Sequence, residues 1–109
     1  MNTESALATL AALAHPTRLQ AFRLLVTHEP DGLPTGALVE ASALTQSTFS
    51  THLAVLAKAG LVTAEKRGRQ QIQRASIVAL RDIMIFLAKD CCQGRPELCD
   101  ALLAELSCG

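Results

Sequence analysis

Four cysteines gather in the last nineteen residues of this 109-residue chain, at Cys91, Cys92, Cys99 and Cys108. Thiolates bind soft metals and metalloids, and they also act as nucleophiles in thiol chemistry. A buried cysteine can serve as a small hydrophobic residue, but three of these lie within nine residues among polar neighbours. The cluster therefore predicts a ligand-binding or redox-active site near the C-terminus.

Three arrangements of these cysteines compete. Disulfides require an oxidising compartment, and a bond between Cys91 and Cys92 would close a very small, strained ring. A structural zinc site normally has four ligands at spacings such as repeated C-x2-C, which this cluster does not match. A trivalent ion such as As(III) or Sb(III) needs only three sulfurs, arranged as a trigonal pyramid.

The spacing favours the third arrangement. A turn at Gly94 and Pro96 would let the chain fold back, so that Cys99 at the start of a final helix approaches the adjacent pair. The start of a helix also favours the thiolate form. We expect Cys91, Cys92 and Cys99 to bind the ion, with Cys108 as a tail residue that could substitute.

A second group of polar side chains begins a segment expected to be helical, residues 46–58. Phe49, Leu53 and Leu56 recur there at helical spacing, and a shorter helix is expected at 35–42, with a break at 42–45. Two short helices with a tight break, the second polar at its start, are typical of a helix-turn-helix. Its expected DNA-facing residues are Gln46, Ser47, Thr48, Ser50, Thr51 and His52.

The sequence suggests roles for two of the histidines. His52 can contact a base, or it can pack within its helix, and the sequence leaves both open. His15 precedes Pro16, where we expect a structural role.

A hairpin is expected directly after the recognition helix. Segments 61–66 and 70–75 alternate in character on either side of residues 67–69, which predicts two strands with a basic tip. A hairpin in this position is a wing, whose cations contact phosphates or enter the minor groove unless the tip is merely solvated. The expected contacts are Lys66, Arg67, Arg69 and Gln71.

The remaining elements are expected to be helices. Half of the residues are apolar and only three are aromatic, which suits a helical core. We expect helices at 4–13, from Pro16, after an N-cap at Ser76, and from Pro96. The fold class is therefore mainly α with a small β-hairpin, as one domain over 1–109. The leucine-rich first, fifth and last helices are expected to form a dimer interface.

Charge and hydropathy bound the partners and the compartment. The formal net charge is zero, but residues 58–74 carry five cations and one carboxylate, which suits nucleic acid. No apolar run approaches the roughly 20 residues of a membrane span. The N-terminal segment carries Glu4 and no basic stretch, unlike a secretory signal. We expect a cytoplasmic protein without a membrane partner.

Three segments resemble the arsenic-responsive ArsR/SmtB repressors: LAALAHPTRLQAFRLL at 10–25, QSTFSTHLAVLAKAGLV at 46–62 and EKRGRQQIQRAS at 65–76. The resemblance implies a winged helix-turn-helix homodimer that represses from double-stranded operator DNA until a metal ion or metalloid weakens the contact.

The chain departs from this family in two places. Residues 35–42 lack the Cys-x-Val-Cys type site of several arsenic sensors, and no histidine follows His52, although the zinc and nickel sensors place Asp and His ligands along the fifth helix. Some arsenite-responsive members carry a vicinal cysteine pair and a third cysteine near the C-terminus. The resemblance therefore supports As(III), or Sb(III), as inducer and implies no organic cofactor.

Other functions stay open. The same fold could sense methylarsenite, Cd(II), Pb(II) or thiol oxidation. A small thiol-dependent enzyme is a rival from another class, but the sequence has no C-x-x-C, no glycine-rich phosphate loop and no catalytic histidine arrangement, so we expect no enzymatic activity. A protein-interaction module that does not bind DNA is a third hypothesis.

Overall fold

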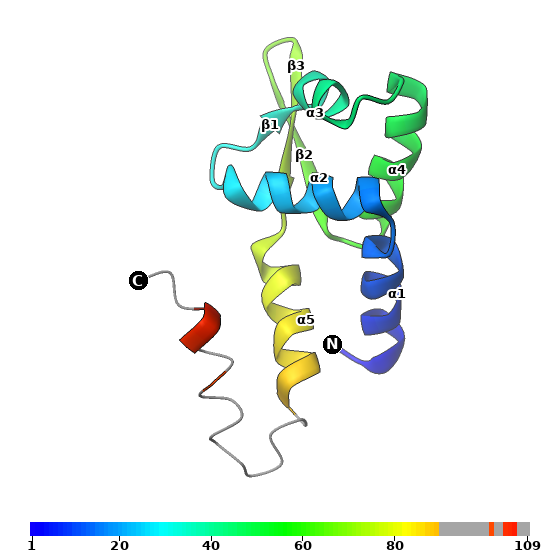
Figure 1. Cartoon of the computed structure of the whole chain (residues 1–109). Coiled ribbons are helices and arrows are strands. Elements are labelled where there is room, and N and C mark those ends of the chain that lie inside the picture. Colours follow the sequence, from blue (N-terminus) through cyan, green and yellow to red (C-terminus); the bar gives the residue numbers. More distant parts are fainter. Residues whose placement is uncertain (90–100, 102–103, 107–109) are drawn as a thin grey trace.

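A computed structural model describes residues 1–89, 101 and 104–106, of which 101 and 104–106 are helical (Figure 1). The elements in chain order are α1 (Thr3–Leu13), α2 (Pro16–Thr27), β1 (Leu33–Pro34), α3 (Thr35–Ser42), α4 (Gln46–Lys58), β2 (Val62–Arg67), β3 (Gln70–Ala75) and α5 (Ile77–Lys89). The expected architecture, mainly helical with a small hairpin after the second helix of a helix-turn-helix, is confirmed.

Side-chain hydrogen bonds cap the first turns of α1 and α5. Asn2 accepts a hydrogen bond from the backbone N–H of Ser5 (2.8 Å), and the Ser5 hydroxyl accepts one from the backbone N–H of Asn2 (3.1 Å). The expected cap at Ser76 is confirmed, because its hydroxyl accepts from the backbone N–H of Ala79 (3.1 Å). Such bonds satisfy amides that have no partner within the helix, and so they define where α1 and α5 begin.

A glycine ends the recognition helix α4. Gly60 has φ +78°, and its N–H donates to the carbonyl of Ala57, while the N–H of Leu61 donates to the carbonyl of Leu56, both at 3.0 Å. This pair of bonds is a Schellman motif, which requires the left-handed conformation that glycine adopts without strain. The motif turns the chain from α4 directly into the wing.

The wing belongs to a three-stranded antiparallel sheet with strand order β1-β3-β2. Arg67 pairs with Gln70 in the register, so the turn consists of Gly68 and Arg69, with Gly68 at φ +64° as the first residue of a primed-type turn. Arg67 therefore lies in β2 and not at the tip, where the sequence pattern had placed it. The two-residue strand β1 was also missed, because it is too short for any periodic signal.

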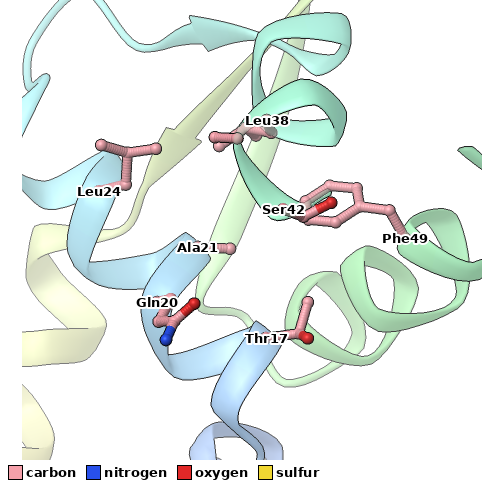
Figure 2. Close-up of a pocket in the computed structure, with 8 residues that line it drawn as sticks. Thr17, Gln20, Ala21, Leu24, Leu38, Ser42 and Phe49 are labelled. Atoms are coloured by element: carbon pink, nitrogen blue, oxygen red, sulfur yellow. The ribbon is translucent and has the colours of Figure 1, made fainter. Parts of the chain in front are cut away.

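The core lies between α2, α3, α4 and the base of the sheet. Its largest fully buried side chains are Phe49, Leu25, Leu38, Leu56 and Leu61. The Phe49 ring on α4 faces α3 across a cavity of about 80 Å³ that α2 closes on the other side (Figure 2). Phe49 thus anchors the recognition helix to the two helices before it.

The helices α1 and α5 lie on the far side of α2 from the hairpin tip, and they contact each other (Figure 1). Both keep apolar side chains on the surface of the single chain, namely Leu7, Leu10, Ile77, Val78, Met84 and Ile85. None of the helices described is long and apolar enough to cross a bilayer.

Candidate nucleic-acid interface

The start of α4 is fixed by its own first residues. The Thr45 hydroxyl accepts a hydrogen bond from the backbone N–H of Thr48 (3.2 Å) and donates to the Thr48 hydroxyl (2.9 Å). Just before it, Ala43 ends α3 in the left-handed conformation (φ +59°), and Ser42 accepts from the N–H of Leu44 (3.1 Å). These local bonds shape the tight turn of the helix-turn-helix, and the Thr48 hydroxyl accepts one of them at the cap.

The two sides of α4 differ in polarity. Phe49, Leu53 and Leu56 pack against the core, whereas the opposite side carries four exposed polar side chains, Gln46, Ser47, Ser50 and Thr51. Their spacing of one, three and four residues places them on one continuous strip of the helix surface. An amide and three hydroxyls in such a strip can donate to and accept from base edges and phosphates.

His52 is turned toward α2. Its Nδ1 lies 3.2 Å from Nη1 of Arg18, and its ring centroid lies 4.2 Å from that of His15 at an interplanar angle of 37°. Burial, the charge on His15 and the charge on Arg18, in that order, lower the pKa of His52 below its usual value. This geometry is a packing contact between helices, because the partners of His52 lie at α2 and not within α4.

The wing cations differ in their surroundings. Nε and Nη2 of Arg67 donate to the two carboxylate oxygens of Glu65 at 3.1 and 3.2 Å, and Nη1 donates to the carbonyl of Asp31 at 3.3 Å. The hydrogen bond from Arg67 and its charge lower the pKa of Glu65. Lys66 and Arg69, in contrast, form no ion pair with any residue that the structure describes. Their charges are available to a partner.

Recognition helix and wing are presented together. The start of α4 and the hairpin tip lie toward the same end of the molecule (Figure 1). Between the start of α3 and the wing, a groove of about 450 Å³ has Gly36 on one side and Arg69 and the exposed Gln71 on the other. The beginning of the recognition helix and the tip of the wing are therefore presented at one end of the molecule.

A chain of two hydrogen bonds holds the start of α3 against the wing. Gln73, 5% exposed, donates from Nε2 to the Thr35 hydroxyl (3.0 Å), which donates to the carbonyl of Gln71 (3.2 Å). The sequence pattern gave no signal for this contact, because its side chains are 38 residues apart. It keeps the wing in place relative to the helix-turn-helix.

The cysteine site lies outside the described residues: Cys91, Cys92, Cys99 and Cys108 all fall there, as does the expected helix start at Pro96. Within the described ranges, no group of three or more His, Cys, Asp or Glu side chains is placed to hold a metal ion.

Comparison with known proteins agrees with this geometry. A family model described as a helix-turn-helix domain matches residues 13–65. HlyU from Vibrio cholerae N16961 is 30% identical, with 84% of this chain and 99% of that chain covered and a TM-score of 0.64. No curated protein sequence matches significantly.

Two further solved structures are similar. A possible transcriptional regulator for arsenical resistance is 31% identical, covering 74% of this chain and 81% of that chain, with a TM-score of 0.64. The homodimeric winged helix-turn-helix DNA-binding domain of Mb0332 from Mycobacterium bovis, described as a possible ArsR-family transcriptional regulator, is 24% identical. It covers 84% of this chain and 85% of its own, with a TM-score of 0.65.

Proposed function

The chain belongs to the ArsR family of winged helix-turn-helix transcriptional regulators, and from this premise we propose that it is a repressor that binds operator DNA as a homodimer. The family is one of DNA-binding regulators and not of enzymes. The observation that carries the proposal is the exposed polar strip of α4, which begins toward the same end of the molecule as the tip of the wing, where Lys66 and Arg69 form no ion pair with the described residues.

The proposed contacts follow from the chemistry of each side chain. Gln46, with an amide that can bond adenine at two points, and the hydroxyls of Ser47, Ser50 and Thr51 enter the major groove. Lys66 and Arg69 bind phosphates or the minor groove, with Gln71 beside them. The remaining members of the expected set, Thr48, His52 and Arg67, act in part through the capping, packing and pairing contacts described above.

A second copy of the chain is the proposed cover for the apolar faces of α1 and α5. Leu7 is 61% exposed and Ile85 is 53% exposed, values that are unusual for such large side chains on two neighbouring helices. The similar Mycobacterium bovis domain is itself homodimeric. A two-fold dimer presents two recognition helices, which fit half-sites roughly 34 Å apart along the duplex.

As(III), or Sb(III), is the proposed inducer, with Cys91, Cys92 and Cys99 as ligands. The support is the donor set, three thiols within nine residues, together with the similarity to a protein described as a possible regulator for arsenical resistance. In the cytoplasm, where we place the protein, these thiols stay reduced. A trivalent ion bound there would be coordinated by all three thiolates at once.

The position of the cysteines explains how binding could reach the DNA. Cys91 follows α5, which ends at Lys89 and belongs to the proposed dimer interface. Bringing the three sulfurs together therefore constrains the chain next to that interface. A coupling free energy of about 1 to 3 kcal/mol is enough for such a link to control operator affinity.

A fluorescence anisotropy titration tests the proposal, with the purified full chain and a labelled duplex from upstream of its own gene. We expect tight binding without ligand and release on addition of arsenite. Replacing Cys91, Cys92 and Cys99 together by serine should preserve DNA binding and abolish release, while Cys108→Ser, the matched control, should respond like the wild type.

The same titration separates the rival functions. Antimonite, methylarsenite, cadmium, lead and peroxide are added to the preformed complex in turn. Release by peroxide but by no metalloid would establish an oxidation sensor in place of the proposed one. Absence of DNA binding would point to a protein-interaction module, and release of the triple-serine variant by arsenite would refute the cysteine site.

A further inference from the structure

One guanidinium joins three helices of the molecule. Arg18 on α2 donates from Nε to the carbonyl of Ala12 (2.6 Å) and from Nη2 to the carbonyl of Ala11 (3.5 Å), both in the last turn of α1. Its Nη1 lies 3.2 Å from Nδ1 of His52, in the middle of α4. Arg18 therefore links the helix with an exposed apolar face to the helix with the polar strip.

The contact requires a particular protonation state of His52. Arginine stays protonated and can only donate, so Nδ1 of His52 must accept and its proton must sit on Nε2. A second proton on His52 would occupy Nδ1, remove the acceptor and place two cations side by side. The link to α4 consequently exists only while His52 is neutral.

His15 adds to the same requirement. As N-cap of α2, its Nδ1 accepts from the backbone N–H of Thr17 (3.1 Å), and its ring lies against that of His52. His15 and Arg18 are the described residues whose charges act on His52, and both disfavour its protonation. No carboxylate among the residues that the structure describes offsets these two charges at His52.

We propose that Arg18 is a positioning residue that orients the recognition helix through neutral His52, so that protonation of His52 weakens operator binding. The inference rests on the proposed function, since it concerns how α4 is aimed at DNA. Phe49, Leu53 and Leu56 hold α4 on the core by apolar contact, which is tolerant of small rotations. A directional hydrogen bond one turn away from Phe49 restricts that rotation.

Lowering the pH distinguishes the proposed role of His52 from the general effect of added positive charge on DNA binding. Protonated histidines add positive charge, and by charge alone they should strengthen binding to the phosphate backbone. The proposal gives the opposite sign: affinity is retained above the usual histidine range and falls as the pH drops through and below it. The lowered pKa of His52 places that loss on the acid side of the usual value.

The test compares operator affinity of the full chain by fluorescence anisotropy from about pH 8 to about pH 5 at constant ionic strength. His52→Asn offers Oδ1 in place of Nδ1 and does not titrate, so it should retain the bond from Arg18 and most of the wild-type affinity at neutral pH, and it should lose less affinity in acid. His52→Leu, without an acceptor, should bind roughly tenfold more weakly at every pH, the scale of a lost hydrogen bond to a charged group. His28→Asn changes an exposed histidine that follows α2, and this variant should keep the wild-type pH profile.

Arg18→Met supplies the second arm, with Arg23→Met, an exposed arginine on the same helix, as its matched control. Arg18→Met should weaken binding at neutral pH without changing the salt slope, because Arg18 does not itself contact phosphate in this account. A reduced slope would make it a direct DNA contact and overturn the inference. If Arg18→Met does not fold by circular dichroism, the two His52 variants still decide.

Failure of the inference differs from failure of the proposed function. A wild-type chain that binds no DNA at neutral pH refutes the function. A chain that binds DNA, but whose wild-type and His52→Asn forms share one pH profile, refutes the positioning role alone.

Discussion

Glu65 and Arg67 lie two residues apart on β2, and the Arg67 guanidinium donates to both carboxylate oxygens of Glu65 at 3.1 and 3.2 Å. The pair lowers the pKa of Glu65, so the carboxylate stays charged well below neutral pH and the pair is lost only as acid reaches that lowered value. Arg69, at the turn, has no such partner among the described residues. Two arginines that look equivalent in the sequence are therefore differently available to DNA.

This difference predicts unequal losses of affinity. Arg69→Ala should weaken operator binding more than Arg67→Ala, and it should reduce the dependence of log affinity on log salt by about one unit per contacted phosphate. Anisotropy titrations at several salt concentrations measure both quantities. Glu65→Gln is the complementary variant, because releasing Arg67 should raise the affinity. Equal losses for the two arginines would show that the Glu65 pair opens at no cost in the complex.

Removing the Phe49 ring should destabilise the fold. Phe49 is 1% exposed and borders an existing cavity, so Phe49→Ala enlarges empty space that the neighbouring helices cannot refill, at a cost of about 3 to 5 kcal/mol. Urea denaturation at a fixed protein concentration measures the loss. Val55→Ala, a change at a 37% exposed position of the same helix, should cost much less. Similar losses in the two variants would contradict the assigned core.

Two glycines in different backbone conformations predict opposite effects of substitution by alanine: Gly60 in the Schellman motif after α4, and Gly36 within α3. Gly60→Ala places a Cβ in open space but in the left-handed conformation, and should destabilise by about 1 kcal/mol. Gly36→Ala, in the first turn of α3 and also in open space, should stabilise by roughly 0.5 to 1 kcal/mol through the unfolded state. Thermal unfolding compares them. A stabilising Gly60→Ala would mean that α4 ends differently.

The exposed face of α5 predicts where the dimer can be broken. Ile85→Lys should place an uncompensated charge in the proposed apolar interface and convert the dimer to monomer. Light scattering after size exclusion gives the mass directly. Thr27→Lys, at an exposed position of α2 away from this face, should leave the dimer intact. If Ile85→Lys remains dimeric, the interface lies elsewhere.

Much of the fold could be predicted from local signals. The bounds of α3, α4 and β3 agree with the predictions from the break at 42–45, the apolar spacing around Phe49 and the alternation in the hairpin. Ser76 marked the start of α5, because an N-cap is a short-range bond that few residue types can make. Periodicity alone could not show that the Thr48 hydroxyl takes part in the cap of α4 or that His52 contacts Arg18, because both depend on particular side-chain partners.

The sequence by itself determined the succession of helices, the helix-turn-helix with its wing, and a thiol-rich tail, because each depends on residues within one or two turns of one another. Only the tertiary structure decided that Arg18 reaches α1 and α4 at once and that Gln73 holds Thr35. It also decided that Arg67 pairs with Glu65, whereas Arg69 has no ion-pair partner in the part of the chain that the structure describes. Those contacts join side chains from separate elements or choose one of several possible partners. Their distances depend on how the core packs, which no local pattern encodes.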